Sequence, residues 1–380
     1  MEKVKVLYFV DRMLRGGIQS LVIDWVSRFD KNKIQVDFLL LDDGNKYELE
    51  DTLKDLGCNV FKLKGIWINT AFDYIKYHKK ANEFFKEHND YKVVHLHSSS
   101  KNYPILKYAK KYNIPIRIAH SHNVDFQTTS RFKKIIGNCF KPLLLKYSTD
   151  YFACAIVAGK WLFGEKIVNS KKFKVIHNAI DFKKFKYNKT NREKIRKEFN
   201  IEKDCTVYGN VGRFSNQKNH TFLIDIFEEI IKMEKDAKLL LVGTGELEEE
   251  IKSKVESKKL TKNVIFTGFR TDVNEIMQAM DVFLMPSLHE GLPVVGMEAQ
   301  ASGMICFMSE GVITPEVKIA SNVHFISLRK EAQEWAKIIK SKTKIRQNNF
   351  EYFKKEKYLI DDIVIELSKI YLDGIKQNEI

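Results

Sequence analysis

Short apolar runs alternate with longer amphipathic segments along almost the whole chain, and this alternation restricts the fold more than any other feature. Residues 34–41 and 93–97 have the length and the Val, Ile and Leu content of buried strands. Residues 18–29 and 71–88 have the apolar spacing of helices. Strands interleaved with helices form parallel sheets. The sequence therefore predicts an α/β fold with doubly wound sheets.

The alternation stops in a Lys-, Asn- and Glu-rich stretch, 183–203, and then starts again at residue 206. A chain of 380 residues is too long for a single core. We therefore predict a first Rossmann-like domain at 1–182 and a second at 183–356, followed by a terminal helix within 357–380.

Composition limits the cellular setting. The longest apolar runs are far shorter than the roughly 20 residues of a membrane span, and the N-terminus runs directly into a predicted strand without a signal peptide. Five scattered cysteines indicate reduced thiols in a cytoplasmic protein. The net charge of +15 fits compositional bias or a basic face for anionic lipid. Nucleic acid is not an expected partner, because no nucleic-acid motif accompanies the charge.

Residues 281–303 predict a strand, a loop and a helix that together position two carboxylates. The apolar run 281–285 is the strand, Pro293 starts the helix 294–301, and Gly303 ends it. Glu290 then lies in the loop and Glu298 on the helix. In open α/β sheets ligands bind at this corner, where a helix N-terminus attracts anions. Two acceptors beside an anion site suit a nucleotide sugar, whereas two surface glutamates would be the ordinary alternative.

Two cations lie in the loop after the first strand of the second half. Arg213 and Lys218 are placed to clamp a diphosphate, although most such side chains are simply solvated. No D-x-D sequence occurs in the chain. We therefore expect no metal and no cofactor, with fixed cations and a helix dipole stabilising the leaving group.

Glycine pairs mark two further turns. Gly16 and Gly17 stand between the first strand and its helix, where backbone amides can approach a phosphate. Gly243 and Gly245 form a G-x-G turn after the strand that begins at residue 238. Each pair alone is weak evidence for a ligand site, because most such pairs are plain turns.

Together these motifs resemble the family 4 retaining glycosyltransferases of the GT-B fold, in which two Rossmann-like domains face a cleft. The resemblance rests on E-x7-E with Gly-Leu-Pro after the first Glu, on G-R-x-x-x-Q-K from Gly212 to Lys218, and on the glycine turns in the same order. It implies catalytic roles for His122, Arg213, Lys218 and Glu290, and a last helix that crosses back to the first domain. The donor-binding residues that it implies are Gly16, Gly17, His120, Arg213, Lys218, Gly243, Gly245, Phe269, Glu290, Gly291, Leu292, Pro293, Val294 and Glu298.

The family carries a histidine at the end of a strand in its first domain, close to the transferred sugar. His122, followed by Asn123, fits the family's His-Asp register better than His120 does. A period of two places both rings on one face of the strand. We take His122 as the active-site residue and keep His120 as the alternative.

Residues 131–146 contain five basic residues, no acidic residue and many large apolar side chains. Such a segment can lie on an anionic membrane surface, and the alternative is an ordinary helix pair with a solvated basic face.

The sequence thus predicts a cytoplasmic, peripherally membrane-bound hexosyltransferase that uses a nucleoside diphosphate-sugar, with UDP as the expected base. The acceptor is expected to be lipid-linked or an oligosaccharide in surface polysaccharide synthesis. Two alternatives stay open: a sugar-nucleotide 2-epimerase of the same fold, and a non-catalytic partner of another transferase.

Overall fold

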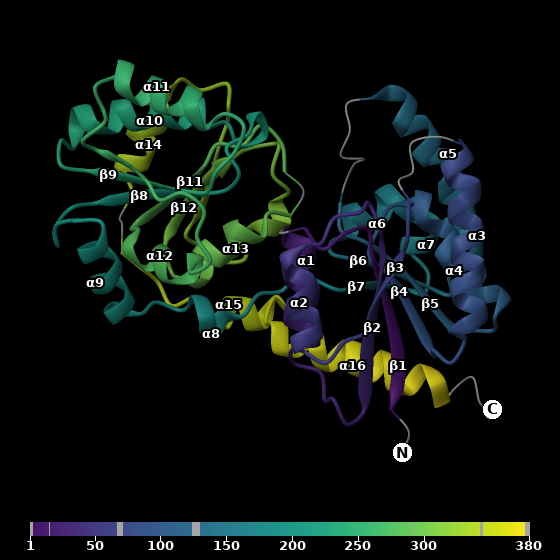
Figure 1. Cartoon of the computed structure of the whole chain (residues 1–380). Coiled ribbons are helices and arrows are strands. Elements are labelled where there is room, and N and C mark those ends of the chain that lie inside the picture. The colour runs from purple at the N-terminus through teal and green to yellow at the C-terminus, as the bar shows by residue number, and fades with distance from the viewer. Residues whose placement is uncertain are drawn as a thin grey trace. The chain divides into compact units, whose positions relative to one another are not determined.

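The computed structural model describes residues 3–14, 16–66, 71–123, 130–290, 292–342 and 345–376. The chain divides into two units (Figure 1). Unit 1 comprises Met1–Ala179 and Ile360–Ile380, and unit 2 comprises Ile180–Leu359. These divisions lie three residues away from the expected ones at 182 and 356. No helix in the described ranges is both long enough and apolar enough to cross a bilayer.

Unit 1 contains a seven-stranded parallel sheet in the order β3-β2-β1-β4-β5-β6-β7. The strands are β1 (Val4–Val10), β2 (Ile34–Leu41), β3 (Val60–Leu63), β4 (Val93–Leu96), β5 (Ile116–Ser121), β6 (Asp150–Ala153) and β7 (Phe173–Val175). Their side chains are mostly buried on both faces of the sheet, as helices on both faces require.

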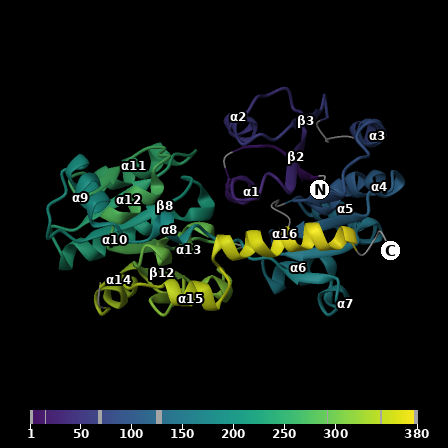
Figure 2. The same ribbon diagram turned by 90° about the horizontal axis from the view of Figure 1, so that it is seen from below.

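The helices of unit 1 are α1 (Gly17–Val26), α2 (Glu48–Asp55), α3 (Ala71–Glu87), α4 (Tyr103–Lys111), α5 (Arg131–Tyr147), α6 (Ile156–Phe163), α7 (Glu165–Val168) and α16 (Ile360–Lys376), with a 3-10 turn η1 (Ser100–Asn102). Helices α1 and α2 cover one face of the sheet, and α3, α4 and α5 cover the other (Figure 2). Right-handed crossovers explain the two faces, because the strand order runs outward from β1 in one direction and from β4 in the other.

The last helix, α16, packs beside α1 in the core of unit 1. Its buried face carries Ile363, Leu367 and Tyr371, which pack with residues of β1 and α1. The Tyr371 hydroxyl also shares hydrogen bonds with the Tyr8 hydroxyl (2.8 Å) and with His95 Nδ1 (2.7 Å). Helix α16 is therefore an integral part of the first unit.

Unit 2 repeats the architecture with a six-stranded parallel sheet in the order β10-β9-β8-β11-β12-β13. The strands are β8 (Val207–Val211), β9 (Lys238–Val242), β10 (Val264–Phe266), β11 (Val282–Met285), β12 (Ile305–Ser309) and β13 (Val323–Ile326). The helices are α8 (Phe182–Phe185), α9 (Lys189–Glu198), α10 (His220–Met233), α11 (Glu248–Ser257), α12 (Val273–Ala279), α13 (Val294–Ala301), α14 (Ala332–Lys340) and α15 (Phe350–Lys355), with 3-10 turns η2 (Asn216–Lys218) and η3 (Pro315–Val317).

The charged stretch 183–203, which the sequence predicted at the start of the second domain, lies within unit 2. It contains α9, which packs against α12. Arg192 and Arg196 of α9 each donate to a different carboxylate oxygen of Asp281 at 2.7 Å. Asp281 also accepts from the Val207 amide at 2.8 Å, so these ion pairs fasten α9 to the starts of β8 and β11. Local composition could not reveal this, because the partners lie more than 80 residues apart.

Candidate functional site

The predicted site residues are divided between the two units. Unit 1 carries Gly16, Gly17, His120 and His122, whereas unit 2 carries the others, with Gly291 lying outside the described residues.

In unit 2 the predicted residues gather where the strand order reverses. Strands β8 and β11 are neighbours in the sheet. From β8 the chain continues to β9 on one side of this pair, and from β11 it continues to β12 on the other side. The loops that follow them, 212–219 and 286–293, therefore meet at the carboxyl edge of the sheet. This reversal point is the usual ligand position in open α/β sheets.

Lys218 and Glu290 form the central contact between these loops. Lys218 Nζ lies 2.6 Å from Glu290 Oε1, and only 17% and 7% of the two side chains are exposed. Gln217 Nε2 donates to the second carboxylate oxygen of Glu290 at 3.2 Å and to the His289 carbonyl at 3.1 Å. Asn219 Nδ2 donates to the Pro286 carbonyl at 3.0 Å. Three consecutive side chains of one loop thus hold the other.

Arg213 occupies a different environment. Its side chain is 74% exposed, and Nε donates to Glu246 Oε2 at 3.0 Å. The two cations predicted for the diphosphate are therefore each paired with a separate carboxylate. An ammonium has three donor hydrogens and a guanidinium has five, so either cation can bind a phosphate oxygen with its carboxylate still in place.

The G-x-G turn supports the Arg213 loop. A Cβ on Gly243, whose φ is +134°, would lie 2.2 Å from the Gly212 carbonyl oxygen. A Cβ on Gly245 would lie 2.3 Å from the Phe214 carbonyl oxygen, and the Phe214 amide donates to the Thr244 carbonyl at 3.0 Å. Both glycines are thus required for close backbone contact with the loop that carries Arg213.

The predicted helix after the acidic loop is present as α13, Val294–Ala301. Pro293 was expected at the first helical position. It is instead the N-cap, with φ −73° and ψ 107°, directly before the first helical residue Val294. Leu292 and Pro293 are buried, and Glu298 is half-buried in the second turn. Gly303 follows the helix with φ +81°, a conformation that permits the predicted stop. Elsewhere at this edge, Phe269 is exposed and follows Gly268, whose φ is +68°.

In unit 1 the two glycines begin α1. Gly16 is the N-cap with extended backbone, and Gly17 is the first helical residue. A Cβ on Gly16 would lie 2.8 Å from Gln19 Oε1. Both glycines are exposed, so the first amides of α1 lie at the surface of the carboxyl edge of this sheet.

Four histidines form a buried ladder across β4 and β5. His95 Nε2 and His120 Nδ1 share a hydrogen bond of 3.0 Å, as do His97 Nδ1 and His122 Nε2. His122 Nδ1 contacts Asn178 Oδ1 at 3.1 Å. The amide oxygen accepts, so His122 Nδ1 carries the proton and Nε2 accepts from His97. Both ring nitrogens of His122 are therefore occupied, and bonding to a sugar hydroxyl would require one of these contacts to open.

Burial keeps this ladder uncharged. It lowers the pKa of His122 to about 4, and burial together with the neighbouring imidazoles lowers the pKa of His95, His97 and His120 well below the usual value. Nitrogens of His95, His97 and His120 lie within 4.8 Å of one another, a spacing that can suit a metal ion. However, the facing nitrogens of His95 and His120 are already joined by a hydrogen bond, and three neutral buried rings offer no charge to offset a cation.

The sequence interpretation did not single out several of these residues. His95 and His97 repeat the period-two pattern of His120 and His122, so paired H-x-H sequences at adjacent strand ends were an available signal. Asn178 was not predicted as a site residue, and Gln217 was part of the G-R-x-x-x-Q-K motif without a role of its own. Their roles as supports of His122 and Glu290 depend on contacts more than 50 residues away.

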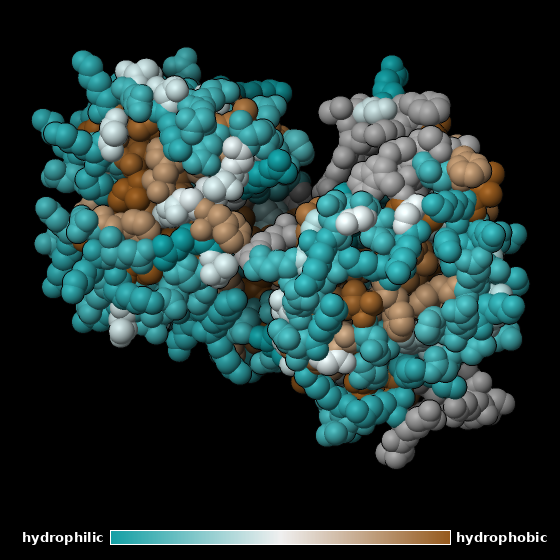
Figure 3. Space-filling view, viewed as in Figure 1, coloured by the Kyte–Doolittle hydropathy of each residue, from teal (hydrophilic) through white to brown (hydrophobic). Residues whose placement is uncertain are grey.

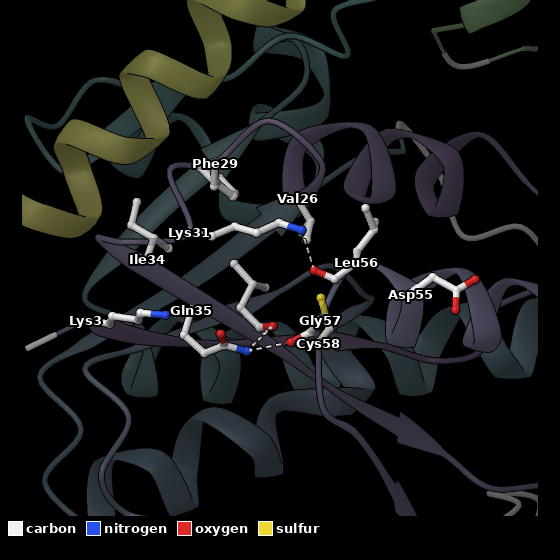
Figure 4. Close-up of a pocket in the computed structure, with 11 residues that line it drawn as sticks. Lys3, Val26, Phe29, Lys31, Ile34, Gln35, Asp55, Leu56, Gly57 and Cys58 are labelled. Atoms are coloured by element: carbon white, nitrogen blue, oxygen red, sulfur yellow. Dashed lines mark hydrogen bonds between the residues drawn. The ribbon is translucent and has the colours of Figure 1, made fainter.

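A separate cavity of about 290 Å³ lies at the opposite, amino edge of the unit 1 sheet (Figure 4). Lys31 Nζ donates to the Leu56 carbonyl at 2.8 Å there, and Gln35 Nε2 donates to the Gly57 carbonyl at 3.1 Å. Burial raises the pKa of the Cys58 thiol to about 12. None of the predicted site residues lines this cavity.

Comparison with known proteins matches each half of the chain to a family model. Residues 15–184 match the family described as Glycosyltransferase Family 4, and residues 191–358 match Glycosyl transferases group 1. The chain is 31% identical to the protein named as glycosyltransferase EpsF of Bacillus subtilis, over 88% of this chain and 86% of that one. It is 25% identical to the UDP-Gal:alpha-D-GlcNAc-diphosphoundecaprenol alpha-1,3-galactosyltransferase of Escherichia coli, over 81% and 79%.

Among solved structures, HepE of Anabaena in complex with UDP-glucose superposes with a TM-score of 0.70 at 17% identity, over 99% of this chain and 97% of that one. This likeness concerns the fold, which is GT-B with two Rossmann-like domains. The family matches and the extended identity to EpsF therefore place the protein in the family 4 glycosyltransferases, and it is a glycosyltransferase.

Proposed function

We propose that this enzyme transfers a hexose or N-acetylhexosamine, with retention of anomeric configuration and without a metal, from a UDP-sugar to a lipid-linked or polysaccharide acceptor. The observation that carries the proposal is the Lys218–Glu290 contact at the strand reversal point of unit 2. It joins the cation proposed to bind the phosphate to the carboxylate proposed to bind the sugar, in the loop that precedes α13.

In this proposal the diphosphate of the donor replaces the carboxylate partners of the two cations. Lys218 and Arg213 turn from Glu290 and Glu246 to the diphosphate, and the N-terminus of α13 adds its dipole. Glu290, released from Lys218, accepts from hydroxyls of the donor sugar, while Glu298 accepts from the ribose. These fixed charges stabilise the leaving group, as preorganised electrostatics do.

The transfer step forms a bond between the acceptor oxygen and the anomeric carbon while the bond from that carbon to the diphosphate breaks. The acceptor's proton passes to an oxygen of the departing diphosphate. His122 is proposed to serve the transferred sugar from unit 1, with Asn178 and His97 fixing its ring. A donor analogue that cannot accept the proton, yet turns over normally, would rule out this route.

UDP is favoured because the E. coli relative is named for a UDP-galactose donor and the HepE structure contains UDP-glucose. The same relative's name contains a lipid diphosphate, which favours a lipid-linked acceptor in surface polysaccharide synthesis here. Contact of residues 131–146 with an anionic membrane belongs to the same proposal.

The test is thermal stabilisation by a panel of nucleotides and nucleotide sugars, with chelator present. A ligand at 100 times its dissociation constant adds roughly 2.7 kcal/mol to the free energy of unfolding. We expect stabilisation by UDP and by one UDP-sugar. Selectivity for GDP or ADP would change the donor, and no stabilisation by any nucleotide would overturn the proposal.

Two variants test which part of the donor each carboxylate binds. Glu298→Ala should weaken binding of UDP itself, whereas Glu290→Ala should weaken the preference for UDP-sugar over UDP. Wild-type turnover in both would show that the acidic motif has been misread. Product analysis without acceptor distinguishes a transferase from an epimerase, because an epimerase converts the free nucleotide sugar without any acceptor.

A further inference from the structure

Asn219 is the last residue of the loop that carries Lys218, and it stands directly before helix α10. Hydrophilic residues cover most of unit 2 in the view of Figure 3, and at the carboxyl edge such residues also join one loop to the other. Asn219 Nδ2 donates to the Pro286 carbonyl at 3.0 Å, alongside the contacts of Gln217 and Lys218 with Glu290. Asn219 thus takes part in the same inter-loop contact, although the G-R-x-x-x-Q-K motif ends one residue before it.

The backbone of Asn219 is left-handed, with φ +55° and ψ +44°. Residues other than glycine adopt this conformation at a cost, which asparagine tolerates better than most. Its amide donates to the Asn216 carbonyl at 3.2 Å and so closes the turn η2, whereas its carbonyl accepts from the Leu223 amide at 3.1 Å in α10. Asn219 is therefore the residue at which the chain changes from the turn that carries Lys218 to the helix.

The helix side of this junction is fixed by the core. His220, the first residue of α10, is buried, and its ring lies edge-on to Phe214 with centroids 4.7 Å apart. His220 Nε2 donates to the amide oxygen of Asn210 at 3.1 Å, and the amide nitrogen of Asn210 donates to the Leu284 carbonyl at 2.6 Å. Because these contacts hold the start of α10, the conformation of residue 219 decides where the preceding turn points.

Lys218 reaches Glu290 along a narrow path. Its stem passes over Gly212, because a Cβ added to that glycine would lie 3.2 Å from Lys218 Cε. The ammonium lies 2.6 Å from Glu290 Oε1. A lysine has a flexible stem of four carbons, so its ammonium stays at one point only where both the stem and the backbone are held. Gly212 gives the stem its path, and Asn219 holds the backbone.

Glycine at position 219 would allow the left-handed backbone but could not bind Pro286. Pro286 is the first residue after β11, and its carbonyl accepts from the half-buried Asn219 side chain. This bond ties the turn that carries Lys218 to the base of the loop that carries Glu290. The junction thus needs a residue that tolerates a left-handed backbone and also has a side-chain donor, and asparagine supplies both.

We propose that Asn219 is a positioning residue of the donor site. Its left-handed backbone and its bond to Pro286 hold the Lys218 ammonium at the place where the diphosphate of the donor binds. The proposal rests on the proposed function, because it requires Lys218 to bind the diphosphate. Asn219 acts through Lys218 and does not touch the donor, so its loss should weaken nucleotide binding only while Lys218 is present.

The test is a double-mutant cycle on the full chain, with Asn219→Gly, Lys218→Met and both together, and with UDP affinity measured by calorimetry. Asn219→Gly keeps the left-handed conformation accessible, so it should fold, and it removes the bond to Pro286. With Lys218 present it should weaken UDP binding roughly fivefold, as expected for the loss of one hydrogen bond. In the Lys218→Met background it should change UDP affinity by less than about twofold. Equal losses in the two backgrounds would overturn the proposal.

Asn219→Asp is the variant closest in shape. Aspartate also tolerates the left-handed region, but its carboxylate cannot donate to the Pro286 carbonyl. It should lose at least as much UDP affinity as Asn219→Gly. Affinity for the UDP-sugar should fall by the same factor, because both ligands carry the diphosphate that Lys218 binds. A loss confined to the UDP-sugar would show that Asn219 acts on Glu290 instead, and would refute the positioning of Lys218.

Asn200→Gly is the matched control. Asn200 is another left-handed asparagine of unit 2, with φ +52°, and it is exposed after α9. The control should keep the UDP affinity and the kcat of the wild type. A fivefold loss in this variant as well would show that the effect comes from added chain flexibility, and the proposal would fail.

Lys218→Met alone separates this proposal from the proposed function. If it binds UDP as tightly as the wild type, the diphosphate assignment of Lys218 is wrong, and the role of Asn219 falls with it. If it binds UDP weakly while Asn219→Gly and Asn219→Asp bind like the wild type, only the role of Asn219 is refuted. The Tm of each variant, measured on the same samples, shows that it is folded.

Discussion

Lys218 and Glu290 are 72 residues apart in sequence and 2.6 Å apart in the fold, with both side chains largely buried. The ion pair joins the loop after β8 to the loop after β11. It therefore preorganises the two motifs around each other.

Lys218→Met should lower both stability and affinity. It leaves the Glu290 carboxylate without its cation, which should cost about 2 kcal/mol in the free energy of unfolding. Loss of a charge-assisted contact should weaken UDP binding roughly 10- to 100-fold. Denaturant titration and calorimetry measure the two effects.

The double variant Lys218→Met/Glu290→Gln separates the effect on stability from the effect on UDP affinity. Removing both charges should restore most of the stability, because no unpaired charge remains buried, while UDP binding stays weak. A single variant with wild-type stability and wild-type affinity would contradict the ion pair and the donor assignment together.

Arg213→Ala should act on turnover and not on stability. The side chain is mostly exposed, so the free energy of unfolding should change by less than about 0.5 kcal/mol. The kcat should fall roughly 100- to 1000-fold if Arg213 stabilises the leaving diphosphate. Lys330→Ala, which opens an exposed pair with Glu334, is the control and should keep wild-type turnover.

Gly245→Ala should disturb the Arg213 loop. Its Cβ would meet the Phe214 backbone, so the loop must shift and UDP affinity should fall along with Tm. Gly57→Ala is the control for strain alone: it has φ +85° with no atom within 4 Å, and should cost about 1 kcal/mol without changing UDP binding. Equal UDP affinity in both variants would count against support of the Arg213 loop by Gly245.

Unit 1 should lose stability in mild acid. The pKa of His122 is lowered by burial to about 4, and those of His95, His97 and His120 are lowered well below the usual value of about 6.5. Below pH 6.5 these histidines become protonated in the unfolded chain but stay neutral in the folded chain. Stability is therefore complete above pH 6.5 and falls as the pH drops toward the folded pKa, by up to about 1.4 kcal/mol per pH unit per histidine.

Calorimetry between pH 7.5 and 5.5 checks this, because carboxylates remain mostly ionised across that range. His122→Asn should reduce the slope of stability against pH. A flat profile for the wild type would show that the ladder is not buried and neutral.

Local patterns predicted much of the secondary structure. The predicted strand 34–41 is found as β2 with the same bounds, and the predicted helix 294–301 is found as α13 with the same bounds. Helices α4 and α6 were not predicted. Each of these helices has only a short run of buried apolar residues, which is too short to indicate a helix by itself. The buried residues include Ile105 and Leu106 in α4, and Leu162 and Phe163 in α6.

Motif spacing predicted which residues belong to the second unit's site, but not how they pair. Neither the contact of Lys218 with Glu290 nor that of Arg213 with Glu246 follows from local sequence. The same is true of the histidine ladder, whose members come from two strands and whose supports, Asn178 and Tyr371, come from elsewhere in the chain.

The sequence by itself determined the alternation of strands and helices, the family motifs and the identity of the charged groups, because these depend on residue type and short-range spacing. Only the tertiary structure decided which charges neutralise one another, which imidazole nitrogens remain available, and where apolar side chains stay exposed. Those outcomes depend on strand order, which brings distant loops to one edge of a sheet, and on burial, which makes each unpaired polar group costly.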